Sequence, residues 1–391
     1  MKTLILIISI TAFSLSLFSQ SNIDKVLAEI EQNNTSLQAF RKSVDAEKIG
    51  NKTDIYLQNP QIAFNYLWGS PSNIGNRKDL NITQTIDFPT VYAYKNQISD
   101  LKNEQSELEY QKQLKSIKLN ASLICADLIY SNALYFELSK QMKNAESIAN
   151  SYKIKFEKGE INILEFNKSQ LNLLNLNKEL QSIEIERNTL LAELTQINGG
   201  KAIDFSEKEF QTAEIPADFE QWYVLAEQNN PTFSWLKKEM EISQKQVGLN
   251  RAMSFPKFQT GYMSENVVGQ QFNGVTIGLT VPLWENKNKV KFAKANILAL
   301  ESIELDNKTQ FYNHLKALHT KTIALQKNVN DFRSNIKTFD NSELLKKALD
   351  AGEISLIDYI FELSYYYESL TKLLELEKDM NKTWVELNQY K

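Results

Sequence analysis

The residues that most often carry enzyme chemistry are scarce in this chain. Its 391 residues include two histidines, His314 and His319, and one cysteine, Cys125. A single cysteine excludes an intrachain disulfide and any zinc site built on several cysteines. The two histidines are five positions apart on a predicted helix, so they share no face suited to binding one metal ion. We therefore expect no metal site and no cofactor, and we expect both histidines to face solvent or a tunnel.

Carboxylates are abundant, but their spacing follows the exposed faces of predicted helices. The chain has 48 Asp and Glu against 44 Lys and Arg, which gives a net charge of −4. No pair of acids stands in an apolar segment, as general acid–base catalysis would need. The sequence also has no phosphate-binding glycine loop and no dinucleotide fingerprint. No basic block is present, which argues against nucleic acid as a partner. This composition predicts a protein that is not an enzyme.

The first twenty residues are typical of a secretory signal peptide. Lys2 precedes an apolar run over 4–18, and small or polar residues follow at 19–21. The run is shorter than the roughly 20 apolar residues that span a bilayer. We expect residues 1–20 to be removed after export, and we expect the mature chain to contain no transmembrane helix.

Prolines and glycines divide the mature chain into helical tracts. No proline lies between 90 and 215 or after 282, and each of these tracts is rich in helix-forming residues. Gly159 and Gly352 stand alone in them, as expected for a helix end at which the chain reverses. Each tract is therefore predicted to be a helical hairpin, and the second arm of each has coiled-coil spacing. The helices are predicted at roughly 22–57, 91–157, 162–197, 218–252, 285–350 and 354–390.

The chain contains a tandem repeat. Residues 31–34 (Glu-Gln-Asn-Asn) recur unchanged at 227–230, and the turn sequence 159–165 recurs in similar form at 352–358. Ordered matches at a near-constant offset indicate a duplicated unit. They divide the mature chain into a first repeat (21–197), a linker (198–217) and a second repeat (218–391). Each repeat is predicted to consist of a helix, a β-hairpin, a long helix and a short helix.

The predicted β-hairpins cover 60–88 and 256–283. Apolar and polar residues alternate along their strands, at 61–68, 80–88, 275–282 and more weakly 258–264, and polar loops are expected at 69–79 and 264–274. Strands with one apolar face suit an outer-membrane barrel, although a soluble hairpin packed on a domain would show the same pattern. Four strands cannot close a barrel, and each unpaired backbone group in lipid costs several kcal/mol. If the strands enter a membrane, several copies must therefore share one barrel.

Together these features resemble the TolC family of outer-membrane efflux channels. The resemblance covers the mature chain and rests on the signal peptide, the duplicated plan, the paired glycine turns and the strand-to-helix junctions at 86–89 and 281–283. It implies a mainly α fold with a small β part, in which long coiled-coil hairpins accompany four strands. It also implies a homotrimer with a shared 12-stranded outer-membrane barrel and an α-helical periplasmic tunnel. The cell would be of the Gram-negative type.

The same resemblance implies the partners and the functional positions. The chain would contact outer-membrane lipid and dock through its periplasmic tip to an adaptor (membrane fusion) protein and an inner-membrane transporter. The tip turns are formed by Gly159, Glu160, Ile161, Gly352, Glu353 and Ile354.

Acidic residues just after the second turn narrow the pore and favour cations in family members. Asp358 occupies this place, and Glu165 is its counterpart in the first repeat. A further acidic position, one helical turn later, is Phe361 here, with Glu362 next to it. Because Ile354 stands where some members carry a basic residue, no salt-bridge lock of a closed gate is implied. The alternative for Asp358 and Glu165 is stabilisation of a helix N-terminus, which favours acids in the first turn.

Two functions remain open at this point. The first is a passive outer-membrane exit duct of a tripartite efflux or type I secretion-like system. The second is a soluble periplasmic coiled-coil adaptor or scaffold. Adaptors usually surround one helical hairpin with glycine-rich β-domains, whereas this chain has two predicted hairpins and only 12 glycines. The sequence therefore favours the duct.

Overall fold

The computed structural model describes residues 22–211 and 213–391. The predicted signal peptide, residues 1–20, lies outside them. The described chain is mainly helical with one four-stranded sheet, which confirms the fold class predicted from the sequence. No helix within these residues is both long enough and apolar enough to cross a membrane.

The chain forms two compact units. Unit 1 consists of the segment ending at Asn34 together with 120–210 and 341–374. Unit 2 consists of 35–119, 211–340 and 375–391. Each unit takes segments from both halves of the sequence, so the units do not follow the predicted repeats. The division into two repeats stays a prediction.

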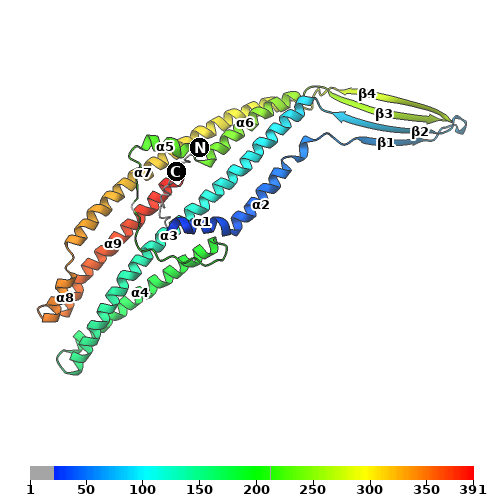
Figure 1. Ribbon diagram of the computed structural model, residues 1–391. Helices are drawn as coiled ribbons and strands as arrows, with labels where there is room; N and C mark the ends of the chain where they lie inside the picture. Colours follow the sequence, from blue (N-terminus) through cyan, green and yellow to red (C-terminus); the bar gives the residue numbers. More distant parts are fainter. Residues whose placement is uncertain (1–21, 212) are drawn as a thin grey trace, which may run out of the picture. The chain divides into compact units, whose positions relative to one another are not determined.

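The regular secondary structure described in unit 1 is all helical (Figure 1). Its elements are α1 (Asn22–Asn33), the part of α3 (Pro89–Glu157) from residue 120 on, α4 (Ile163–Ile197), α8 (Ser342–Ala351) and the beginning of α9 (Leu356–Asn388). The segment after α4 also packs here, because Ile203 and Phe205 are buried. This part of the predicted linker is therefore packed within unit 1.

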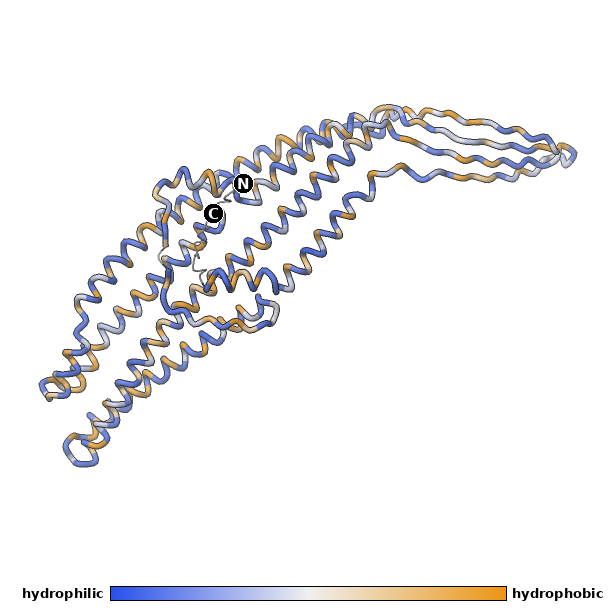
Figure 2. Tube along the Cα trace, in the orientation of Figure 1, coloured by the Kyte–Doolittle hydropathy of each residue, from blue (hydrophilic) through white to orange (hydrophobic). Residues whose placement is uncertain are grey.

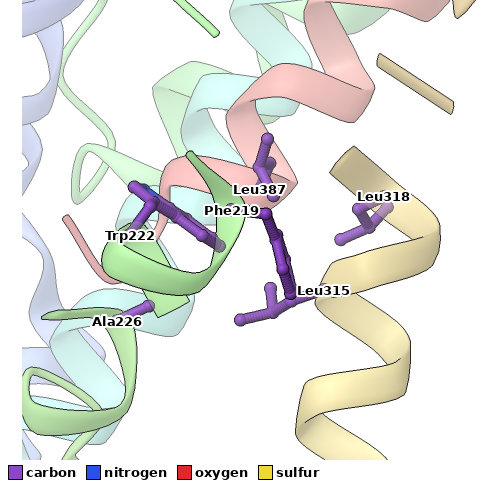
Figure 3. Packing of buried hydrophobic residues seen from close by; sticks show 6 residues of the cluster. All are labelled: Phe219, Trp222, Ala226, Leu315, Leu318 and Leu387. Atoms are coloured by element: carbon purple, nitrogen blue, oxygen red, sulfur yellow. The ribbon is translucent and has the colours of Figure 1, made fainter. Parts of the chain in front are cut away.

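Unit 2 combines helices with the sheet. Its helices are α2 (Thr35–Gly50), the beginning of α3, α5 (Phe219–Gln228), α6 (Pro231–Ala252), α7 (Lys289–Thr338) and the end of α9, with short 3-10 turns η1 (Thr53–Ile55) and η2 (Ser72–Ile74). One of its cores joins three helices (Figure 3). There Phe219 and Trp222 of α5 pack with Leu315 of α7 and the fully buried Leu387 of α9.

The sheet has the order β1-β2-β3-β4 and is antiparallel throughout. Its strands are β1 (Gln61–Leu67), β2 (Arg77–Ile86), β3 (Lys257–Val267) and β4 (Gln270–Thr280). Ile62, Ile82, Tyr262 and Val275 are paired in one row across all four strands. Because side chains alternate along a strand, this register puts most apolar positions on one face. Figure 2 shows the alternation of hydrophobic and hydrophilic residues along the strands. Ile277, on the same face, is 82% exposed.

The predicted loop at 264–274 is wrong. The ladder between β3 and β4 continues to the pair Val267–Gln270, so only Val268 and Gly269 form the turn. Both have positive φ, 50° and 82°, as two-residue hairpin turns prefer. Polar residues stand on both faces near the turn, Asn266 and Gln271 on one face and Glu265 and Gln270 on the other, so alternation could not reveal the strand ends.

Three predicted helices are interrupted. The first breaks at Asn34, the fourth at Asn229–Asn230 and the fifth at 339–341. The first two breaks fall on the repeated Glu-Gln-Asn-Asn motif. The side chain of Asn230 accepts a 2.9 Å hydrogen bond from Thr232 N and caps α6, which has Pro231 at its start. The side chain of Asn34 donates a 2.7 Å hydrogen bond to Ile197 O. The repeated motif therefore marks a break between two helices, where a continuous helix was predicted.

Candidate functional site at the helix turns

The first glycine turn ends α3 with paired backbone hydrogen bonds. Gly159 N donates to Phe156 O at 2.9 Å, and Glu160 N donates to Lys155 O at 2.9 Å. Gly159 has φ of 73°, a left-handed conformation that side chains rarely adopt. The turn passes directly into α4, whose N-cap Asn162 accepts hydrogen bonds from Leu164 N and Glu165 N. The chain therefore reverses within a few residues.

The second glycine turn repeats this geometry at the end of α8. Gly352 has φ of 75°, its N–H donates to Leu349 O at 3.1 Å, and Glu353 N donates to Ala348 O at 2.9 Å. Ser355 then precedes α9 as Asn162 precedes α4. The hydroxyl of Ser355 donates to the Asp358 carboxylate at 2.6 Å and accepts the Asp358 N–H at 3.2 Å. The two turns are equivalent in their backbone and in the way they start the next helix.

The predicted acidic residues occupy the first turns of their helices. Asp358 is exposed and is bound to Ser355, which is the capping arrangement named above as the alternative. Glu362 is exposed one helical turn further along α9 and lies on the same side as Asp358. Glu165 is half-buried near Tyr152; burial raises the pKa of Tyr152, and the Glu165 carboxylate raises it further. Their role at a pore stays a prediction.

The predicted docking residues fall into two groups by burial. Gly159, Glu160, Gly352 and Glu353 are exposed. Ile161 is half-buried, and Ile354 packs against a core formed by residues of α3, α8 and α9. This core contains Ile148, Leu356, Tyr359 and Leu363, with Tyr152, Leu345 and Leu349 at its edge. The isoleucines therefore anchor the turns, while the glycines and glutamates are accessible to a partner.

Hydrogen bonding and ring stacking fix the helices behind the turns. Asn144 Nδ2 of α3 donates a 2.6 Å hydrogen bond to the hydroxyl oxygen of Tyr359, a buried residue of α9. Phe156 and Phe166 stack across the first turn, with ring centroids 5.1 Å apart. These contacts were not predicted from the sequence. The capping pairs have a sequence signal, because Asn162 and Ser355 are typical N-cap residues placed three positions before an acid.

The remaining candidate residues form no site. No group of three or more His, Cys, Asp or Glu in 22–211 and 213–391 could hold a metal ion. His314 is exposed as expected, but His319 is buried, and its Nε2 donates a 2.8 Å hydrogen bond to Pro216 O. The expectation that His319 faces solvent or a tunnel is wrong. Burial raises the pKa of the Cys125 thiol to about 12, which is typical of a buried structural cysteine.

Solved structures with the same architecture are outer-membrane channels. CusC matches with a TM-score of 0.76 at 12% identity, over 94% of this chain and 91% of that one. Its structures concern conformational changes that accompany folding and transmembrane channel formation. The Campylobacter jejuni outer-membrane channel CmeC matches with a TM-score of 0.75 at 15% identity, over 95% of this chain and 86% of that one. The chain has the TolC fold.

The likeness extends to an open channel. The open state of the Neisseria gonorrhoeae outer-membrane channel MtrE matches the TolC fold of this chain with a TM-score of 0.70 at 13% identity, over 94% of this chain and 88% of that one.

No protein-family model matches the sequence, and no curated relative was found. The resemblance found in the sequence is therefore confirmed at the level of the fold.

Proposed function

We propose that this chain is the protomer of a passive outer-membrane exit duct in a tripartite efflux or type I secretion-like system. The observation that carries the proposal is the sheet. One of its faces is apolar and exposed, including Ile62, Val275 and Ile277 at 70%, 81% and 82%. A sheet in water would bury such a face, because a large exposed apolar patch marks contact with a partner or with lipid.

The two edges of the sheet support an assembly of several copies. β1 and β4 are the outer strands, and neither has a second strand partner within the described residues. An open edge in lipid is excluded by the cost of its unpaired backbone groups. We propose that β4 of one copy pairs with β1 of the next and that three copies close a 12-stranded barrel in the outer membrane.

The opposite face of the sheet is suited to line a pore. Arg77 Nε lies 2.8 Å from Asp79 Oδ1, and Arg77 Nη2 lies 3.2 Å from Glu265 Oε2. Asp79 and Glu265 are paired across β2 and β3. Ionised groups are expensive in lipid, so this face belongs in a water-filled lumen and the apolar face belongs outside.

The helical turns supply the proposed periplasmic end. We propose that the exposed residues Gly159, Glu160, Gly352 and Glu353, anchored by Ile161 and Ile354, dock to a periplasmic adaptor that connects the duct to an inner-membrane transporter. We also propose that Asp358, Glu362 and Glu165 line the narrow tip of the trimer. Capping by Asp358 does not compete with this role, because one carboxylate oxygen accepts the Ser355 hydrogen bond and the other is free to act on passing ions.

The test combines mass, location and conductance. Light scattering of the purified chain in detergent should give the mass of three copies, and planar bilayers should show discrete channel openings. A monomer without conductance would contradict the duct. The alternative, a periplasmic coiled-coil adaptor or scaffold, predicts release by osmotic shock in the soluble fraction, whereas a duct stays with the outer membrane.

A further inference from the structure

Unit 1 contains a cavity of about 350 Å³ between α3, α4 and α9, next to the core that anchors the second glycine turn. Its inner wall is apolar and aromatic: Leu363 and Tyr359 are 7% and 2% exposed, and Tyr367 also lines it. Its rim is formed by carboxylates and amides. The size is that of a site for one small organic molecule, since such pockets start at about 300 Å³.

The charged residues that line the cavity are all acidic. Glu179 of α4 and Glu368 of α9 line it, and its lining contains no Lys, Arg or His. Glu179 makes no ion pair within the described part of the chain, and the Asn172 and Asn175 side chains beside it carry no charge. Two carboxylates above aromatic rings therefore create a negative potential that nothing in the lining offsets.

Within the described residues, the one ion pair that engages a lining carboxylate is weak. Lys372 Nζ lies 2.6 Å from Glu368 Oε1 on the same helix, and both side chains are largely exposed, at 59% and 62%. Pairs of this kind contribute little, because solvent screens them and both side chains lose freedom. An incoming cation can replace Lys372 at this carboxylate.

From these observations we propose that the cavity binds an organic cation with an aromatic or branched apolar body. The body would lie against Leu363 and the tyrosine rings, where a cation is attracted by the ring faces. Its positive charge would lie between Glu179 and Glu368. An inorganic cation is disfavoured by the apolar wall and an organic anion by the two carboxylates. The inference concerns a site within one copy and does not depend on the proposed duct function.

The test uses a cation and an anion of the same shape. Tetraphenylphosphonium and tetraphenylborate are each measured by equilibrium dialysis against the full chain in detergent, with protein-free detergent as the blank. We expect saturable binding of one tetraphenylphosphonium per chain and at least tenfold weaker binding of tetraphenylborate. Equal binding of the two ions, or no saturable binding of the cation, would overturn the proposal.

Paired variants separate the cavity from general surface charge. The double variant Glu179→Gln/Glu368→Gln should lower the affinity for tetraphenylphosphonium at least tenfold. The control Glu186→Gln/Glu375→Gln removes the same charge from α4 and α9 at exposed positions outside the cavity and should change it less than twofold. Equal losses in the two double variants would refute the site.

A third variant tests the cavity without changing its charge. Asn175→Trp places a large ring in the exposed rim and leaves the buried wall intact. It should weaken tetraphenylphosphonium binding at least tenfold while the helical circular dichroism stays at the wild-type value. Unchanged affinity in this folded variant would contradict binding inside the cavity.

Discussion

The hydroxyl of Ser355 donates a 2.6 Å hydrogen bond to the Asp358 carboxylate and accepts a 3.2 Å hydrogen bond from the Asp358 N–H. This reciprocal pair starts α9 immediately after the second glycine turn. It gives Asp358 a structural role that is independent of any pore, so the two roles can be separated by changing one partner at a time.

Ser355→Ala removes the cap and keeps the charge. Loss of an N-cap hydroxyl costs about 1 kcal/mol, so the thermal midpoint should fall while the ion selectivity of the channel stays unchanged. Asp358→Asn keeps a polar side chain of the same size and removes the charge. If Asp358 lines the tip, this variant should lower the preference for cations, measured as the reversal potential across a KCl gradient in planar bilayers.

Glu353→Gln is the matched control, because Glu353 is an exposed acid in the turn itself. It should leave both the midpoint and the reversal potential close to the wild-type values. An equal change in selectivity for Glu353→Gln and Asp358→Asn would show that only the overall charge of the turn matters.

The two faces of β4 should respond differently to the same charged residue. Ile277 lies on the apolar face of the sheet. Thr276 lies on the opposite face, which also carries the ion pairs of Arg77. A lysine facing lipid near the middle of a bilayer costs about 2–4 kcal/mol. Ile277→Lys should therefore reduce the amount of trimer in the outer-membrane fraction, whereas Thr276→Lys should assemble normally. Equal yields would place both faces in water.

The alternation of strand residues could be recognised from the sequence, because Ile62, Ile82, Val275 and Ile277 put most apolar positions on one face of the sheet. The same rule failed near Val268–Gly269, where polar residues stand on both faces and the strand ends are fixed by backbone pairing. It gives no information on the proposed pairing of β1 and β4 between copies.

Helix interruptions were harder to predict because they depend on distant contacts. Asn34 ends a helical stretch while its side chain donates to Ile197 O, a residue 163 positions away. Local propensity is too weak to predict such a bend, since Asn is tolerated inside helices. The turns at Gly159 and Gly352 were predictable, because a lone glycine in a left-handed conformation is a local signal.

The resistance of the segment after α4 to proteolysis should depend on Asn132. Asn132 Nδ2 donates to Phe205 O and Glu207 O, at 3.3 and 2.9 Å, and its Oδ1 accepts a 2.7 Å hydrogen bond from Arg187 Nε. Asn132 is buried, so Asn132→Ala leaves these largely enclosed groups without their partner, which costs about 1–3 kcal/mol. Trypsin should then cut at Lys201 or Lys208 several times faster than in the wild type.

Asn150→Ala is the control for this experiment, because it changes an exposed asparagine on the same helix. Its cleavage rate should match the wild type. Slow cleavage of Asn132→Ala would mean that the buried side chains of Ile203 and Phe205 hold the segment without help from the hydrogen bonds.

The ion pairs of Glu107 make part of the stability of unit 2 depend on pH. Hydrogen bonds from Arg41 and then from Lys48, at 2.7 and 2.9 Å, lower the pKa of Glu107 from 4.5 to about 2. A carboxyl group with a lowered pKa stabilises the fold fully above its unfolded value, and this stabilisation is lost as the pH falls toward the folded value. The relevant window therefore lies between pH 4.5 and about 2.

Glu107→Gln should lower the free energy of unfolding at pH 7 by about 1 kcal/mol, a small value because the Glu107 side chain is 38% exposed and solvent screens the pair. The difference from the wild type should shrink as the pH falls below 4.5 and vanish near 2. Denaturant titrations followed by circular dichroism at several pH values measure it. The control Asp100→Asn alters an exposed acid of the same helix and should show no such trend. A difference that stayed constant down to pH 2 would mean that Glu107 stabilises α2 against α3 through packing and not through its charge.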